Sequence, residues 1–129
     1  MLARKPFAGA EPAPELRAVD SATVAEALTE ALASLSLEIV QLVGVDPQIE
    51  VTVRYPQPWA TCPACQAATA QVHSRHVQRK RDRDLQGKAV WLLLVRRRFR
   101  CWRCGKVFME PDPACGLRYR STRRFREGR

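Results

Sequence analysis

Hydrophobic residues change from a helical to an alternating spacing within the first half of the chain. Between residues 22 and 35 they recur every three or four positions, and Thr23 with Glu26 forms a capping-box pair at the start. This spacing predicts a helix with one apolar face. Residues 37–54 are instead rich in β-branched residues that alternate with polar ones around a central turn, which is typical of a half-buried hairpin. We therefore expect a helix plus a β-hairpin within residues 21–60.

The second half predicts three further strands. Residues 70–79 and 89–100 flank turn residues at 86–88, and a short strand is expected at 106–110. The apolar run from 89 to 95 is too short to cross a bilayer, so we expect no membrane partner. The helix has an apolar stripe that needs a partner surface, which is either the following strands or a second copy of the chain.

Both ends of the chain lack this periodic pattern. Residues 1–20 are rich in Ala, Pro and Glu, so we expect a flexible leader. They do not resemble a signal peptide, which favours a cytoplasmic protein with reduced thiols. Residues 113–129 form an Arg-rich basic tail.

Four cysteines form two pairs with the same two-residue gap, Cys62-Pro63-Ala64-Cys65 and Cys101-Trp102-Arg103-Cys104. A gap of this length lets one tight turn direct both sulfurs at a single point, so two pairs can hold one tetrahedral metal ion. This layout predicts a structural zinc ion, Zn(2+), within a zinc-ribbon at residues 61–112. Iron in a rubredoxin-like site, disulfides and two unrelated pairs remain as alternatives.

The remaining candidate ligands have weaker patterns. Cys115 has no second cysteine at ligand spacing, so we expect a free thiol. His73 and His76 are expected to pack or to face phosphates, because four thiolates already fill a structural site.

Positive charge is concentrated in the half that carries the cysteines. Residues 1–60 contain four Lys/Arg and eight Asp/Glu, whereas residues 75–129 contain eighteen Lys/Arg and five Asp/Glu. A concentrated positive field attracts phosphate backbones, so nucleic acid is the expected partner. Alternate strand residues share a face, which groups Arg96 with Arg98 and Arg100. The candidate contacts are His73, Arg75, Arg79, Lys80, Arg81, Arg96, Arg98, Arg100, Arg123 and Arg124.

Several short motifs occur in a recognisable order around the cysteines. They are Cys62-Pro63-Ala64-Cys65, Val72-His73-Ser74-Arg75, Arg81-Asp82, Arg97-Arg98-Phe99-Arg100-Cys101, Phe108-Met109-Glu110 and Thr122-Arg123-Arg124-Phe125-Arg126-Glu127. In this order and spacing, residues 62–127 resemble the N-terminal zinc-finger region of bacterial insertion-sequence transposases of the ISL-three family. The chain departs from that pattern at His76, at Arg83-Asp84 and in the short gap of the second cysteine pair.

The resemblance implies a DNA-binding module that helps a transposase find the terminal repeats of its mobile element. It also implies helix-turn-helix and Asp/Asp/Glu catalytic domains further downstream, so we expect no catalysis by this chain alone and a truncated or partial transposase. Such a protein would be cytoplasmic and associated with the nucleoid. An iron electron-transfer protein and a zinc-stabilised protein-interaction module are the alternatives. The predicted fold class is a small α+β protein with flexible termini.

Overall fold

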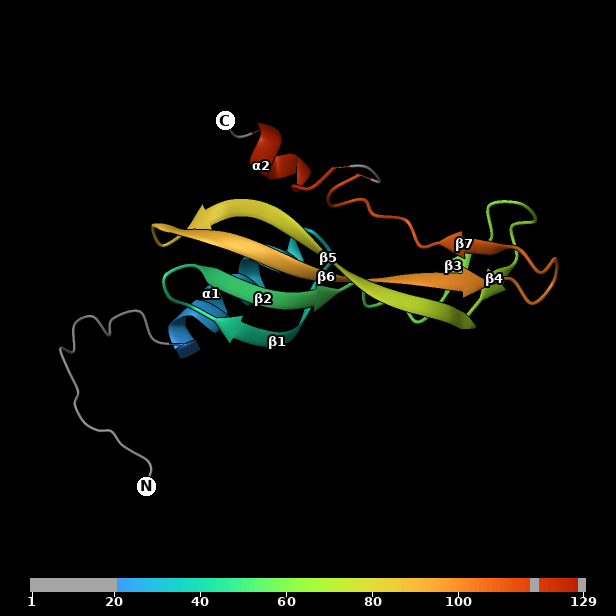
Figure 1. Ribbon diagram of the computed structural model, residues 1–129, viewed down its shortest axis with the longest axis horizontal. Helices are drawn as coiled ribbons and strands as arrows, with labels where there is room; N and C mark the ends of the chain where they lie inside the picture. The colour runs from blue at the N-terminus through green and yellow to red at the C-terminus, as the bar shows by residue number, and fades with distance from the viewer. Residues whose placement is uncertain (1–20, 117–118, 128–129) are drawn as a thin grey trace, which may run out of the picture.

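Two long strands form the spine of the molecule. The computed structural model describes residues 21–116 and 119–127, so the expected leader at residues 1–20 lies outside the described residues. β5 (Val72–Leu85) and β6 (Lys88–Arg100) pair antiparallel along almost their whole length, and β6 runs through both halves of the molecule (Figure 1). The turn between them has positive φ at Gln86 (52°) and Gly87 (79°). Two positive φ values match the twist of a two-residue hairpin turn, and glycine adopts them without strain.

The N-terminal elements pack on one end of this spine. α1 (Ser21–Ala33) precedes β1 (Glu38–Gly44) and β2 (Ile49–Arg54), which pair antiparallel as the expected hairpin. β2 also pairs with β6, and this pairing is parallel. The sheet order is therefore β1-β2-β6-β5, so the hairpin and the cysteine-bearing strands share one sheet. No helix in the described ranges is long and apolar enough to span a membrane.

The cysteine pairs lie at the other end of the spine. β3 (Ala60–Thr61) and β4 (Ala68–Thr69) pair with each other around the first cysteine pair, and β7 (Val107–Met109) pairs with β6 after the second. The α+β class is as expected. The expected ribbon of three strands is wrong in strand count and order, because β5, β6 and β7 belong to a five-stranded sheet.

β6 buries opposite faces in its two halves. Val90, Leu92 and Leu94 lie in a core with α1 and β2, whereas Phe99 and Cys101 lie in a second core with Phe108. Because successive side chains of a strand point to opposite faces, the change from even to odd positions places the two cores on opposite faces of the ladder. β5 and β6 cross near the middle of the molecule in Figure 1, as a twisted ladder does.

A buried carboxylate fastens the segment after β7 to the sheet. The Asp112 side chain is fully buried and lies 3.2 Å from Arg96 Nη1 and 3.8 Å from Lys80 Nζ. Tyr55 donates its hydroxyl proton to the same carboxylate and accepts a hydrogen bond from the Ala114 backbone N–H. Two buried cations and one tyrosine thus meet at one carboxylate, and Arg96 Nε lies a further 3.9 Å from Glu110.

A second carboxylate fastens the C-terminal helix. Arg124, at the start of α2 (Arg123–Glu127), donates hydrogen bonds to both oxygens of Asp82 at 2.8 and 2.6 Å. Thr122 donates a further hydrogen bond to Asp82, and a short parallel bridge joins Ser121 to Arg81 at the edge of β5. The described part of the expected basic tail is therefore packed against the sheet.

Replacing Asp112 by Asn should destabilise the fold strongly. Arg96 and Lys80 would keep their buried charges without this counter-ion, and losing one partner of a buried ion pair costs about 3–5 kcal/mol. Urea unfolding measures this cost. Asp46→Asn is the matched control, because its ion pair with Lys88 involves a side chain that is 78% exposed and should contribute at most about 1 kcal/mol. Equal losses for the two variants would contradict this account of the buried network.

Asp82 should make stability depend on acid pH. Burial alone would raise its pKa, but hydrogen bonds from Arg124 and Thr122 outweigh burial and hold the pKa below the ordinary value of 3.8. A carboxyl with a lowered folded pKa contributes stability above its unfolded pKa and loses it as pH falls through the folded one. The difference in unfolding free energy between the native chain and Asp82→Asn should therefore shrink below about pH 4. A difference that stays constant down to pH 2 would contradict this.

Candidate metal centre

The two cysteine pairs occupy loops with the same backbone geometry. In the first, Gln66 N–H donates to the Cys62 carbonyl at 2.8 Å; in the second, Gly105 N–H donates to the Cys101 carbonyl at 3.0 Å. The residue after the second cysteine has positive φ in both loops, 67° at Gln66 and 79° at Gly105. Glycine suits this conformation and Gln does not, so the first loop keeps its shape at a local conformational cost.

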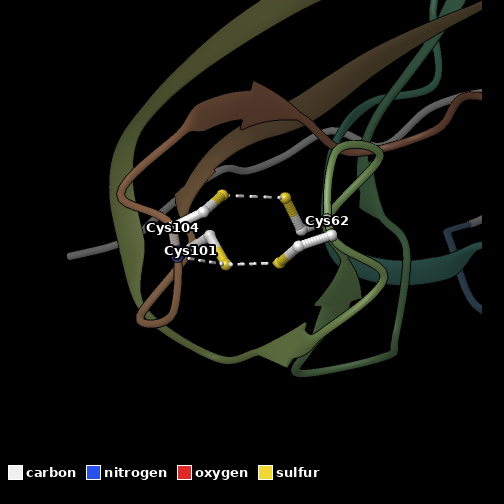
Figure 2. Close-up of side chains that lie close together, drawn as sticks. Cys62, Cys101 and Cys104 are labelled. Atoms are coloured by element: carbon white, nitrogen blue, oxygen red, sulfur yellow. Dashed lines mark hydrogen bonds between the residues drawn. The ribbon is translucent and has the colours of Figure 1, made fainter.

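These loops bring four sulfurs to one point. Figure 2 shows Cys104 facing Cys62 across a gap, with a second pair of sulfurs below. The Cys62–Cys104 sulfur distance is 3.6 Å, the Cys65–Cys101 distance is 3.5 Å, and all four ligand atoms lie within 4.8 Å of one another. Four thiolates at a Zn–S distance of about 2.3 Å form a tetrahedron with edges of about 3.8 Å. The arrangement fits one zinc ion.

Backbone donors favour the thiolate form of Cys101. The N–H groups of Cys104 and Arg103 point at Cys101 Sγ, at 3.4 and 3.3 Å. The bond from Cys104 is the main cause of a lowered Cys101 pKa of about 6, although desolvation acts against it. Because the thiolate is the form that binds metal, a lowered pKa favours zinc at neutral pH.

Packing and hydrogen bonds fix the two loops relative to each other. The Phe99 and Phe108 rings stack with centroids 6.0 Å apart, in the core that contains Cys62 and Cys101. The Trp102 indole N–H donates to the Ala68 carbonyl at 2.7 Å, so a residue of the second loop bonds to β4 beside the first. The four ligands are thus held by elements far apart in the sequence.

A site with four thiolate ligands is structural rather than catalytic. Zinc in this coordination has no open position for water or substrate, so it acts as a cross-link between β3/β4 and β6/β7. Within residues 21–116 and 119–127, the four cysteines are the only group of three or more Cys, His, Asp or Glu that could hold a metal ion.

The other candidate ligands lie away from this centre. His73 and His76 are exposed on β5. The Cys115 thiol is fully buried in the first core, where burial and then the charge of Asp112 raise its pKa to about 12. Cys115 is therefore a packed, protonated thiol.

The structure divides the expected nucleic-acid contacts into two groups. Arg96 and Lys80 are buried, with exposures of 0% and 3%, and both pair with Asp112. Their assignment to a DNA-facing surface is therefore wrong, because residues 110–112 cover that part of the face. Further candidates already have carboxylate partners: Arg79 with Glu50, Arg81 with Asp84, and Arg124 with Asp82.

The second group is exposed and forms no ion pair with a carboxylate in the described ranges. It comprises His73, Arg75, Arg98, Arg100 and Arg123. Arg103 and Lys106, which are not among the predicted contacts, are also exposed beside the second cysteine pair. Their signal was present in the sequence, since residues 85–109 contain no Asp or Glu that could neutralise them.

Zinc removal should unfold one end of the molecule and spare the other. The native chain should bind one zinc ion without colour, whereas Cys62→Ser should lose it. A chelator should abolish hydrogen-exchange protection at residues 60–69 and 99–109 but leave it at 49–53 and 90–94, because the first core contains no zinc ligand.

Cys115→Ala serves as the control and should keep one zinc ion per chain. A chelated protein with unchanged protection in β3, β4 and β7 would contradict the structural role of the metal. A red, iron-containing protein would contradict the assignment of the metal as zinc.

Comparison with known families agrees with this centre. Residues 51–104 match the family model described as the zinc-finger of transposase IS204/IS1001/IS1096/IS1165. Searches of curated proteins and of solved structures find no match. The match spans all four cysteines, and it agrees with the predicted resemblance and with structural zinc. Residues 51–104 are therefore similar to the zinc-finger of this transposase family, and their four clustered cysteines support a zinc-binding module.

Proposed function

We propose that the chain is the DNA-binding part of a transposase and that it binds duplex DNA at the ends of its mobile element. The proposal is supported by the family match of residues 51–104 and by the distribution of charge around the zinc centre. In a bacterial cell this activity places the protein in the cytoplasm, at the nucleoid.

One observation carries the proposal: the exposed cations of the zinc end have no carboxylate partners. In the described part of the chain every Lys/Arg–Asp/Glu ion pair involves a positive residue from elsewhere, at Arg54, Arg79, Lys80, Arg81, Lys88, Arg96, Arg97 or Arg124. Arg98, Arg100, Arg103 and Lys106 are exposed and take part in none of these pairs.

The surrounding sequence sharpens this contrast. Residues 55–81 and 85–109 contain no acidic residue at all. A surface of unpaired cations costs stability through self-repulsion. A bound polyanion removes this cost, and the counterions condensed on the polyanion are released when the protein binds. Duplex DNA is the polyanion that the family match favours.

Zinc makes this surface rigid rather than reactive. Arg98 and Arg100 lie on β6, which ends directly before Cys101, while Arg103 lies between the ligands Cys101 and Cys104. Holding the cysteines therefore holds the arginines. A preformed surface binds with a smaller loss of conformational entropy than a mobile one.

No catalytic role is proposed for these residues. Strand transfer that uses paired metal ions needs a cluster of free carboxylates. Asp82, Glu110 and Asp112 are buried, and each is held by an arginine. The chemistry of transposition is assigned to other domains of the enzyme.

Salt dependence tests the proposed phosphate contacts. The zinc-loaded chain should bind a fluorescent duplex with an affinity that falls linearly in a plot of log K against log salt. Replacing both Arg103 and Lys106 by Ala should reduce that slope by about 2, because each phosphate contact contributes about 0.9.

Arg54→Ala is the matched control, since its side chain is 54% exposed and already pairs with Glu38 in the acidic half. It should leave the slope unchanged. An affinity indifferent to salt, or an equal effect of the control variant, would contradict the proposal.

A further inference from the structure

The open face of the sheet beside the zinc site has a distinct side-chain pattern. Phe99 and Cys101 point into the zinc-end core, so their neighbours Arg98 and Arg100 point to the opposite face. Both are exposed. Ser74 of β5 lies directly opposite Arg98 on one side of β6, and Met109 of β7 lies opposite it on the other. A three-stranded face thus has two arginines along its centre.

The end of this face is set by the buried network. Arg96, two residues before Arg98, is covered by residues 110–112 and bonds to Asp112 and to the Glu110 carbonyl. Arg98 is the first position of the row that is free of this cover. Nothing in the described ranges pairs with its side chain, whereas Arg100 has a single long contact of 3.5 Å to the Gly105 carbonyl.

The dimensions of this face match those of duplex DNA. Neighbouring strands lie about 4.8 Å apart, and the major groove of B-form DNA is about 12 Å wide and admits a two-stranded β-ribbon, such as β6 with one of its neighbours. Alternate strand residues are separated by about 6.8 Å, which equals two base-pair steps of about 3.4 Å. Two arginines in one row therefore meet bases two steps apart.

Together these features favour contacts to bases in addition to contacts to phosphates. The geometry points to a β-sheet that enters the major groove, with Arg98 and Arg100 as specificity-determining residues that each recognise a guanine, two base pairs apart. This inference rests on the proposed DNA binding and adds its target. An arginine guanidinium donates two parallel hydrogen bonds to guanine O6 and N7, a pattern that no other base pair presents in the same way. Arg103 and Lys106, on the loop beyond β6, are left to contact phosphates.

Enrichment of bound duplexes from a random-sequence library, with the zinc-loaded full chain, tests the inference. The enriched sites should contain two guanines separated by one base pair. Arg98→Lys keeps the charge but not the two-pronged donor, so it should lose the preference at one guanine and weaken binding to the enriched duplex by about 10-fold. Arg54→Lys is the matched control, because Arg54 is exposed, pairs with Glu38 and lies outside the proposed surface, so this variant should keep the enriched sequence. Both variants should retain one zinc ion per chain.

Modified bases then identify the groove. Replacing the guanine by 7-deazaguanine removes the N7 acceptor of the major groove. This change should lower the affinity of the native chain about as much as Arg98→Lys does, and it should not lower the affinity of the Arg98→Lys variant any further. Replacing it by inosine changes only the minor groove and should have little effect. Binding without any enriched sequence, the same loss for both lysine variants, or a larger effect of inosine would overturn the inference while leaving DNA binding intact. Failure to bind any duplex would instead overturn the proposed function.

Discussion

The ladder between β5 and β6 is the constraint on which the rest of the structure depends. It is long enough to build two cores, and it buries even positions of β6 at one end and odd positions at the other. Because alternate side chains point to opposite faces, each core leaves one face of the ladder open at its own end. The twist of the pair, visible in Figure 1, accommodates this exchange of faces. The open face at the zinc end is where Arg98 and Arg100 emerge.

Electrostatics follows the same division. Around the first core, buried carboxylates form ion pairs that join separate segments: Asp112 pairs with Arg96 and Lys80, and Asp82 pairs with Arg124. These cations are structural, since a buried charge without a partner is costly. Around the zinc site, residues 55–81 and 85–109 contain no acidic residue, and the four cysteine sulfurs face one another. High positive charge therefore has two roles in this protein, and burial separates them.

Local sequence patterns predicted the features that depend on short spacing. The helix at residues 22–35, the hairpin and the four zinc ligands each follow from a few neighbouring residues. The parallel pairing of β2 with β6 does not, because an alternating strand shows which residues share a face but not which strand lies beside it. The predicted contact of Arg96 with DNA was wrong for a related reason. Alternation grouped it correctly with Arg98, but only the path of residues 110–112 decides which of the two is covered.

In the proposed DNA binding, zinc acts only through shape, by holding a row of arginines in place. The most direct test is to titrate zinc into metal-free protein while recording zinc occupancy and duplex affinity on the same sample. We expect the affinity to rise in proportion to zinc occupancy and to reach its maximum at one zinc ion per chain. Full affinity in the metal-free protein would contradict it, because the arginines would then need no clamp.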